Sequence, residues 1–387
     1  MLPLRVIARN EAIQIHNFAR KYKKNRNRQL FNSVEWSKNL LFFNLHFNFF
    51  YFCPLKTQNQ LTMKKLKKIA SVLMLAAIAV FAAGCTKPDE PNNGGDDNGG
   101  GGETPEVPTI PTGAIDGLFT INENGGKVYF SQGNLQYQAS TNTFRFAENQ
   151  WNFIGGSYED NQMGNVNGSD NCLIANTYSG WIDLFSYGTS GWNGGGNTSF
   201  EPYAYSSSPD SFLDKDLTGE YAKADWGVYN AISNGGNQAG LWRTLTKDEW
   251  EYVINGRSGN IRYARAQVNG VNGLVLVPDG WDNSVYELKN VNSGGSNWDV
   301  NTIYQSVWEN TLEPAGCVFL PNAGWRSINS IGVRVYETGT NGNYWSSTAC
   351  DLSSPHAYKM NVSWQGPGVS ASFANNGYSV RLVQDVQ

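Results

Sequence analysis

Histidine and cysteine, which carry much of the catalytic and metal chemistry of proteins, are scarce in this chain. There are three histidines and five cysteines among 387 residues, and only His356 lies after residue 62. A histidine-based metal site is therefore excluded from the C-terminal part, and a histidine-assisted nucleophile has one candidate there. The chain also lacks Gly-x-Ser-x-Gly, P-loop and Cys-x-x-Cys motifs. We therefore expect a protein that is not an enzyme and that needs no cofactor.

Basic residues are scarce as well. From Thr86 onward the chain has 15 Lys/Arg and 31 Asp/Glu, a net charge of −16. This balance repels phosphate groups, so it argues against nucleic acid or an anionic bilayer as a partner. Leucine and isoleucine are sparse, whereas glycine (42), tyrosine (19) and tryptophan (13) are frequent. The composition predicts an α+β domain of short strands, many turns and an aromatic core, without long helices.

One apolar run does stand out, in residues 63–85, which read MKKLKKIASVLMLAAIAVFAAGC. Four lysines precede an apolar stretch shorter than the ~20 residues of a membrane span, and small residues end it, as in secretory signals. The final Ala-Ala-Gly-Cys resembles the lipobox of bacterial lipoproteins. The resemblance implies a signal peptide that is cut before Cys85, and a Cys85 thiol that is acylated.

The segment before this signal is unlike the rest of the chain. Signal peptides begin near the initiator methionine, so Met63 is the expected start and residues 1–62 are interpreted as a spurious upstream extension or a disordered segment. A membrane helix at Leu40–Cys53 is the alternative, although that run is short and contains His46.

Residues 86–113 are rich in Pro, Gly, Asn and acids and are expected to form a disordered tether. Asp89 and Glu90 resemble the surface-export signal of Bacteroidetes lipoproteins. The resemblance implies a lipid-anchored protein at the cell outer membrane, with a folded domain at residues 114–387 exposed on the cell surface.

Hairpin signals recur through the folded part. Lys127–Gln138 is expected to form two strands about a Gln-Gly-Asn turn, the first of several N-terminal β-hairpins. Asn269-Gly270 lies between two alternating segments and is the pair that a type I′ turn requires. Leu274–Pro278 and Cys317–Pro321 are nearly continuous apolar runs and are expected to be central strands.

Two helices are expected. In the first, Asp225 is the N-cap, Trp226, Tyr229 and Ile232 fall on one face at three-residue spacing, and Asn234-Gly235-Gly236 ends the helix.

In the second, Thr246 and Glu249 have the spacing of a capping box, Trp250 follows, and Gly256 ends the helix. The nearby acids are interpreted as helix-start residues on a solvated face. A pair of catalytic carboxylates is the alternative.

The segment from Asp225 to Arg257 resembles formylglycine-generating-enzyme-like domains, on its Glu-Trp-Glu-Tyr signature at residues 249–252. The C-terminal part resembles the Fibrobacter major paralogous (FISUMP) domain. Both resemblances imply a C-type-lectin-like fold. The matching C-terminal residues are Leu320, Pro321, Gly324, Arg326, Trp345, Ser346, Ser347, Thr348, Gly377, Ser379, Val380 and Arg381.

Within these motifs, a structural role is assigned to Thr246, Glu249, Trp250, Arg326, Trp345, Ser346, Ser347 and Arg381. Four tryptophans that could stack on sugar rings are the candidate ligand-binding residues: Trp192, Trp281, Trp325 and Trp364. Filling of the aromatic core is the alternative role for such residues.

Formylglycine-generating enzymes rely on a close cysteine pair, and this chain has only Cys172, Cys317 and Cys350 after the lipidation site. An oxidising cell envelope would permit a disulfide between Cys317 and Cys350, and at least one of the three thiols would stay unpaired within the chain. The loop Asp160–Asn171 faintly resembles a calcium loop but lacks EF-hand spacing, so turn formation is preferred and no metal is assigned.

Three hypotheses remain for function. The first is a surface-anchored, non-enzymatic binding or adhesion lipoprotein for a glycan or a surface protein. The second is a structural accessory subunit of a surface or fimbrial assembly. The third is an enzyme of formylglycine-generating or hydrolase type, which the cysteine and histidine counts oppose.

The lipoprotein interpretation makes a direct prediction. When the chain is expressed from Met63, the wild type should partition with membranes and Cys85→Ala should not, because stable anchoring needs two or more acyl chains. Fractionation of the cells measures this. Equal partitioning of the two chains would show that Cys85 is not the anchor.

Overall fold

The structure, a computed structural model, describes residues 109–155, 170–172, 175–192, 200–329 and 332–386. The predicted signal peptide with Cys85, the upstream segment, most of the tether and nearly all of the Asp160–Asn171 loop lie outside these residues. The described part mixes strands with a few short helices, in agreement with the expected α+β class.

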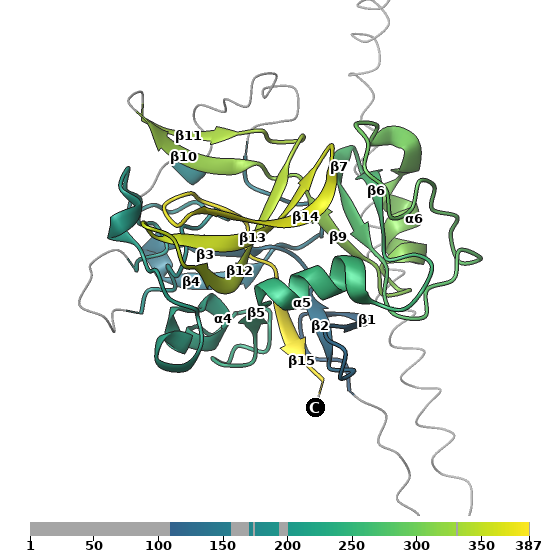
Figure 1. The fold of residues 1–387 in the computed structure, drawn as a ribbon, viewed down its shortest axis with the longest axis horizontal. Coiled ribbons are helices and arrows are strands. Elements are labelled where there is room, and N and C mark those ends of the chain that lie inside the picture. The colour runs from purple at the N-terminus through teal and green to yellow at the C-terminus, as the bar shows by residue number, and fades with distance from the viewer. Residues whose placement is uncertain (1–108, 156–169, 173–174, 193–199, 330–331, 387) are drawn as a thin grey trace, which may run out of the picture. The chain divides into compact units, whose positions relative to one another are not determined.

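The strands form several small sheets (Figure 1). Within the described residues, two sheets have four strands, in the orders β1-β2-β15-β5 and β8-β6-β7-β9; one has three, β12-β13-β14; and two are pairs, β3-β4 and β10-β11. Their bounds are β1 Ala114–Thr120, β2 Lys127–Ser131, β3 Leu135–Gln138, β4 Thr143–Phe146, β5 Arg243–Thr244, β6 Tyr263–Val268, β7 Val271–Leu276, β8 Thr302–Ile303, β9 Val318–Pro321, β10 Trp325–Asn329, β11 Gly332–Tyr336, β12 Gly342–Cys350, β13 His356–Ser363, β14 Gly366–Phe373 and β15 Leu382–Asp385.

The predicted Asn-Gly hairpin is confirmed. β6 and β7 pair antiparallel, with Val268 opposite Val271, and Asn269 and Gly270 both have positive φ (49° and 82°). Because a type I′ turn needs two left-handed residues, this dipeptide fixes the register locally. β7 is central in its sheet, but β9 is at the edge, so the prediction of a second central strand is wrong. The residues of β9 are nevertheless apolar, because two hydrophobic clusters bury its alternate side chains.

The predicted hairpin at Lys127–Gln138 is also wrong. Both strands exist, but β2 pairs with β1 and β15, whereas β3 pairs with β4. The turn between them sends the chain into a second sheet, and Gly133 allows this because a side chain there would meet the Ala147 carbonyl oxygen at 2.5 Å. Pairing of β2 with β15 brings the first and last strands of the domain into one sheet.

Helix α5 (Lys247–Glu251) begins with the predicted capping box. The Thr246 hydroxyl accepts from the Glu249 amide at 3.2 Å, and the Glu249 carboxylate accepts from the Thr246 amide at 2.8 Å. A π-helical turn, Tyr252–Gly256, continues the helix to the predicted end. Glu249 also forms a salt bridge with Arg243, which forms a second salt bridge with Asp385 at 2.7 Å. Glu249 is therefore a structural partner that helps to link α5 with β15.

Helix α4 (Trp226–Tyr229) is shorter than predicted. Asp225 caps it as expected, accepting from the Gly227 amide at 3.1 Å. The helix stops at Asn230, whose side-chain amide donates to the Trp226 carbonyl and holds an extended backbone. Ile232 is buried beyond the helix, and Tyr229 is exposed, so the predicted common face does not form.

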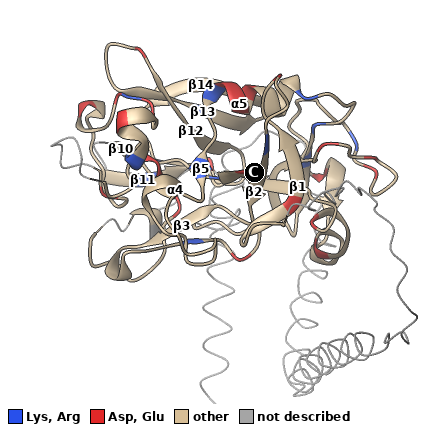
Figure 2. Cartoon of the chain, turned by 90° about the horizontal axis from the view of Figure 1, so that it is seen from below, with Lys and Arg blue, Asp and Glu red and all other residues tan. Residues whose placement is uncertain are grey.

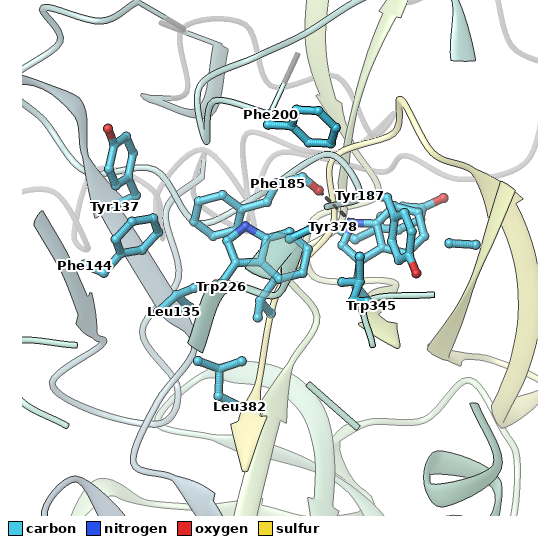
Figure 3. Close-up of a cluster of buried hydrophobic side chains, with 14 of the residues drawn as sticks. Leu135, Tyr137, Phe144, Phe185, Tyr187, Phe200, Trp226, Trp345, Tyr378 and Leu382 are labelled. Atoms are coloured by element: carbon cyan, nitrogen blue, oxygen red, sulfur yellow. Dashed lines mark hydrogen bonds between the residues drawn. The ribbon is translucent and has the colours of Figure 1, made fainter. Parts of the chain in front are cut away.

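Aromatic side chains supply much of the core, as the composition predicts. In the largest cluster, the ring centroids of Trp226 and Phe185 are 5.9 Å apart. The Trp345 ring packs against Tyr187 and Tyr378, with centroid distances of 5.4 and 4.6 Å (Figure 3). The Trp345 indole donates to the Phe185 carbonyl at 2.7 Å, so its polar edge is satisfied.

Arg381 lies just before β15 and is fully buried. Its guanidinium donates to Gln150 Oε1 at 2.8 Å, and to Asn134 Oδ1 and the Phe319 carbonyl at 3.4 Å. Burial lowers its pKa to about 10, partly offset by Tyr344 and Glu313. Uncharged oxygens therefore take the place of a carboxylate partner.

All three described cysteines are free, so the Cys317–Cys350 bridge does not form. Cys317 is buried in an apolar cluster, and burial raises the pKa of its thiol. Cys350 is half-buried at the end of β12.

Removing the Arg381 side chain should destabilise the fold. Arg381→Ala leaves a cavity and deprives Asn134 and Gln150 of a donor, so we expect a loss of ~3 kcal/mol in the free energy of unfolding. Lys289→Ala, at an exposed lysine, should change it by less than ~0.5 kcal/mol. Urea unfolding of the detergent-solubilised chain measures both values, and equal values would rule out a structural role for Arg381.

Candidate functional site

The four candidate tryptophans lie in different surroundings. Trp192 is half-buried beside Phe200 and Tyr221, and Trp281 is half-buried against an apolar cluster with its indole donating to Asn283. Trp364, at the β13–β14 turn, is 65% exposed. Trp325 is half-buried and stacks on Tyr336 across the β10–β11 pair, with centroids 5.1 Å apart. No ring contact joins two of the four within the described residues.

The residues assigned a structural role lie mainly inside the fold. Trp250, Trp345, Arg326, Ser346 and Ser347 are all buried. The Trp250 indole donates to the Trp345 carbonyl, and the Ser346 hydroxyl donates to the Tyr358 carbonyl at 2.7 Å. Their hydrogen bonds are thus made to the protein itself.

The three-stranded sheet β12-β13-β14 has two different faces. On one face, Tyr344, Met360 and Val362 are buried in a cluster that includes Trp250 of α5. On the other face, Trp345 of β12 is paired with Lys359 of β13, which is paired in turn with Ser370 of β14. Paired residues of adjacent strands share a face, so Trp345, Lys359 and Ser370 lie in one row. This second face is therefore apolar at β12 and polar at β13 and β14.

Polar side chains from β13, β14 and the segment after β14 form a hydrogen-bonded surface on this second face, and we call that surface the Lys359 face. Lys359 Nζ lies 3.5 Å from Ser370 Oγ and 5.4 Å from the Tyr378 ring centroid. The hydroxyls of Ser372 and Tyr378 are 2.7 Å apart. The residues of the face are Lys359, Asn361, Ser370, Ser372, Asn376 and Tyr378.

The Trp325–Tyr336 stack borders this face. Arg326 and Gly377 form an antiparallel bridge, with N–O distances of 2.8 and 2.9 Å. Gly377 permits this approach, since a Cβ there would lie 2.6 Å from Arg326 Nε. Trp325 precedes Arg326 and Tyr378 follows Gly377, so in this antiparallel pairing Trp325 and Tyr378 are opposite each other. Both belong to the same apolar cluster.

Glu337 completes the border. Its carboxylate accepts from the Trp325 indole at 3.3 Å and from the Asn341 amide at 2.6 Å. Glu337 also has a left-handed backbone (φ 57°), which is uncommon for a residue other than glycine and is found at functional sites.

The Lys359 ammonium is in an unfavourable environment. Burial lowers its pKa to about 8, partly offset by Glu337, and no described acid lies within ion-pairing distance. Lys247 shows the opposite case, since its pKa is raised by a hydrogen bond to Glu251. A half-buried ammonium that has hydroxyls and an aromatic ring as neighbours, and no described acid as a partner, is a candidate binding-site group.

A hollow of about 400 Å³ lies elsewhere, between residues 214–221 and the end of β12. Tyr221, Cys350 and the exposed Leu352 line it together with Asp214, Asp216 and Asp351. Asp216 already accepts from the Ala349 amide at 2.7 Å, and Asp214 is paired with Lys215. Elsewhere in the described residues, acidic and basic residues are scattered, apart from the acids of α5 (Figure 2).

The other candidates have structural surroundings. His356 Nδ1 lies 2.8 Å from the Ser354 carbonyl, and its ring packs on Phe373. Asn171, a described residue of the loop that faintly resembles a calcium loop, uses its side-chain amide to donate to the Ile154 carbonyl and to Asp183. Among the described residues, no cluster of ligating side chains could hold a metal, and no helix is long and apolar enough to cross a membrane.

The chain matches no family model, no curated protein and no solved structure. Of its residues, sequence reasoning named Trp325 but missed Lys359, Tyr336, Glu337 and Tyr378. The only sequence signal for Lys359 is that it is one of two cations after residue 350.

Lys359 should lower stability at neutral pH. Its folded pKa, about 8, is below the unfolded value of ~10.4, so the folded state binds fewer protons between these values and its stability rises with pH across this range. Lys359→Met should therefore be more stable by ~1 kcal/mol at pH 7, and the gain should shrink toward pH 10.

Urea unfolding at pH 7 and pH 10 measures this difference. Lys289→Met, at an exposed lysine, should be neutral at both values. A Lys359→Met chain that is less stable than wild type at pH 7 would show that the ammonium stabilises the fold instead.

Proposed function

We propose that the chain is a surface-anchored lipoprotein whose folded domain is a non-enzymatic binding or adhesion module for glycans. The signal segment ending at Cys85 and the tether at residues 86–113 support attachment to the outer membrane by an acyl anchor, with the domain held away from the bilayer. A surface protein is the other partner class that this location permits.

The observation that carries the proposal is the juxtaposition of Trp325 with the Lys359 face. Sugars are bound by an aromatic ring that packs on their C–H surface and by polar groups that bond their hydroxyls. Trp325 provides an accessible indole supported by Tyr336, and the adjoining face provides hydroxyls and amides already held by mutual hydrogen bonds.

For the fold, we propose the C-type-lectin-like architecture. Support comes from the motif residues that match the FISUMP domain, which meet in space. Arg326 bridges to Gly377, Tyr344 bridges to Ser379, and the Trp345 amide donates to the Ser379 carbonyl. Three separate motifs thus form one framework beside the site.

One observation favours the alternative function, a structural subunit of a surface or fimbrial assembly. The Trp345 amide points away from β13 to Ser379, so by alternation the amides of Val369 and Ala371 point away from β13 on the other side. They donate to no described residue. A free edge strand of this kind can pair with a second copy of the chain.

A glycan array with the detergent-solubilised chain tests the proposal. At least one glycan class should bind, and Trp325→Ala should weaken that binding by about tenfold or more, equivalent to ~1.4 kcal/mol. Trp364→Ala changes a more exposed indole at the β13–β14 turn and should leave binding unchanged. Loss of binding with Trp364→Ala alone would place the site elsewhere, and cross-linking of copies on intact cells without glycan binding would favour the structural alternative.

A further inference from the structure

The Lys359 face contains more hydrogen-bond donors than its own residues use. Ser372 and Tyr378 each have one hydroxyl proton, and both oxygens accept from the Asn376 side-chain amide, at 3.1 and 3.3 Å. Only one of the two protons lies between the hydroxyls. The other is donated to no described residue, so it is free to bond a ligand.

Two further donors adjoin this hydroxyl pair. Asn361 uses its carbonyl oxygen to accept from Ser370 at 3.3 Å, and its amide N–H groups bond no described residue. The Lys359 ammonium has three N–H donors, and its one close oxygen is Ser370 Oγ at 3.5 Å, a marginal contact. A ligand at this position would meet donors and one positive charge.

No charge on the other described elements pairs with that ammonium. Glu337 is the acid whose field reaches Lys359, and its carboxylate is held by Trp325 and Asn341. Tyr378 presents its ring to the ammonium and keeps its proton, because burial raises its pKa to about 12. Among the described residues, no carboxylate pairs with the Lys359 ammonium.

Resting on the glycan-binding function proposed above, we infer that the Lys359 face selects sugars that carry a carboxylate, such as uronic acids. The carboxylate lies against the Lys359 ammonium with the free hydroxyl and the Asn361 amide as further donors, and the pyranose ring packs on Trp325. A charge-assisted pair of this kind is about twice as strong as a neutral hydrogen bond. The net charge of −16 after Thr86 gives no general attraction for acidic polymers, so the selectivity depends on this one lysine.

The test uses matched ligands. Uronic-acid oligosaccharides, the same oligosaccharides with each carboxyl reduced to an alcohol, and a sulfated set are titrated calorimetrically into the detergent-solubilised chain. The uronates should bind at least about tenfold more tightly than their reduced forms. Lys359→Met should abolish that preference, whereas Lys289→Met should keep it.

Proton uptake gives a second readout that a merely structural lysine would not produce. The free ammonium, with a pKa of about 8, is about half protonated at pH 8, and a bound carboxylate raises that pKa. Titration at pH 8 in two buffers of different ionisation enthalpy should therefore show uptake of about half a proton per uronate bound by the wild type, and none by Lys359→Met.

The outcomes separate this inference from the proposed function. If reduced and acidic forms bind equally and Trp325→Ala weakens both, glycan binding stands and the selectivity for carboxylates is wrong. If only the sulfated set binds, the carboxylate assignment is likewise overturned. If no glycan binds to a chain whose thermal melt is normal, the proposed function and the inference both fail.

Discussion

The hydrogen bond between Gln150 and Arg381 joins parts of the chain on which the rest of the fold depends. Gln150 is fully buried and makes four contacts: Oε1 accepts from Arg381 and from the Phe319 amide, and Nε2 donates to Glu313 and to the Cys317 carbonyl. The start of β9, the approach to β15 and the segment after β4 are thereby fixed together. Since β15 also pairs with β2, the ends of the domain are tied to its centre.

The candidate site follows from this framework. The bridges from Arg326 to Gly377 and from Tyr344 to Ser379 hold the segment before β15 between the β10–β11 pair and the β12-β13-β14 sheet. Tyr378 therefore packs on Trp345 and also opposes Trp325. The same residues that complete the core thus bring an indole from one element beside a lysine from another. Because a framework of buried hydrogen bonds is costly to rearrange, it holds the side chains of the candidate site in one arrangement.

Local signals were sufficient to predict particular elements, and distant pairings were not. The Thr246–Glu249 capping box and the Asn269-Gly270 turn each depend on contacts within a few residues, and both were predicted correctly. β2 and β3 were expected to pair because they adjoin in sequence, yet β2 pairs with β15, about 250 residues away. Trp325 was named as a candidate, but its neighbours Tyr378 and Lys359 come from a bridge and a sheet that no periodicity reveals.

Three cations in buried or half-buried positions show why Lys359 differs from the framework residues. Arg381 and Arg326 each have a protein acceptor that orients the guanidinium, Gln150 at 2.8 Å and Ser186 at 3.1 Å respectively. A planar fork suits such fixed acceptors, whereas an ammonium on a flexible stem is a mobile point charge. Among the described residues, Lys359 has no comparable acceptor, and it faces hydroxyls toward the edge of a sheet. Stability alone would favour an apolar residue there. A lysine at that position is accounted for if its missing counter-ion arrives with a ligand, since stability is commonly sacrificed at binding sites.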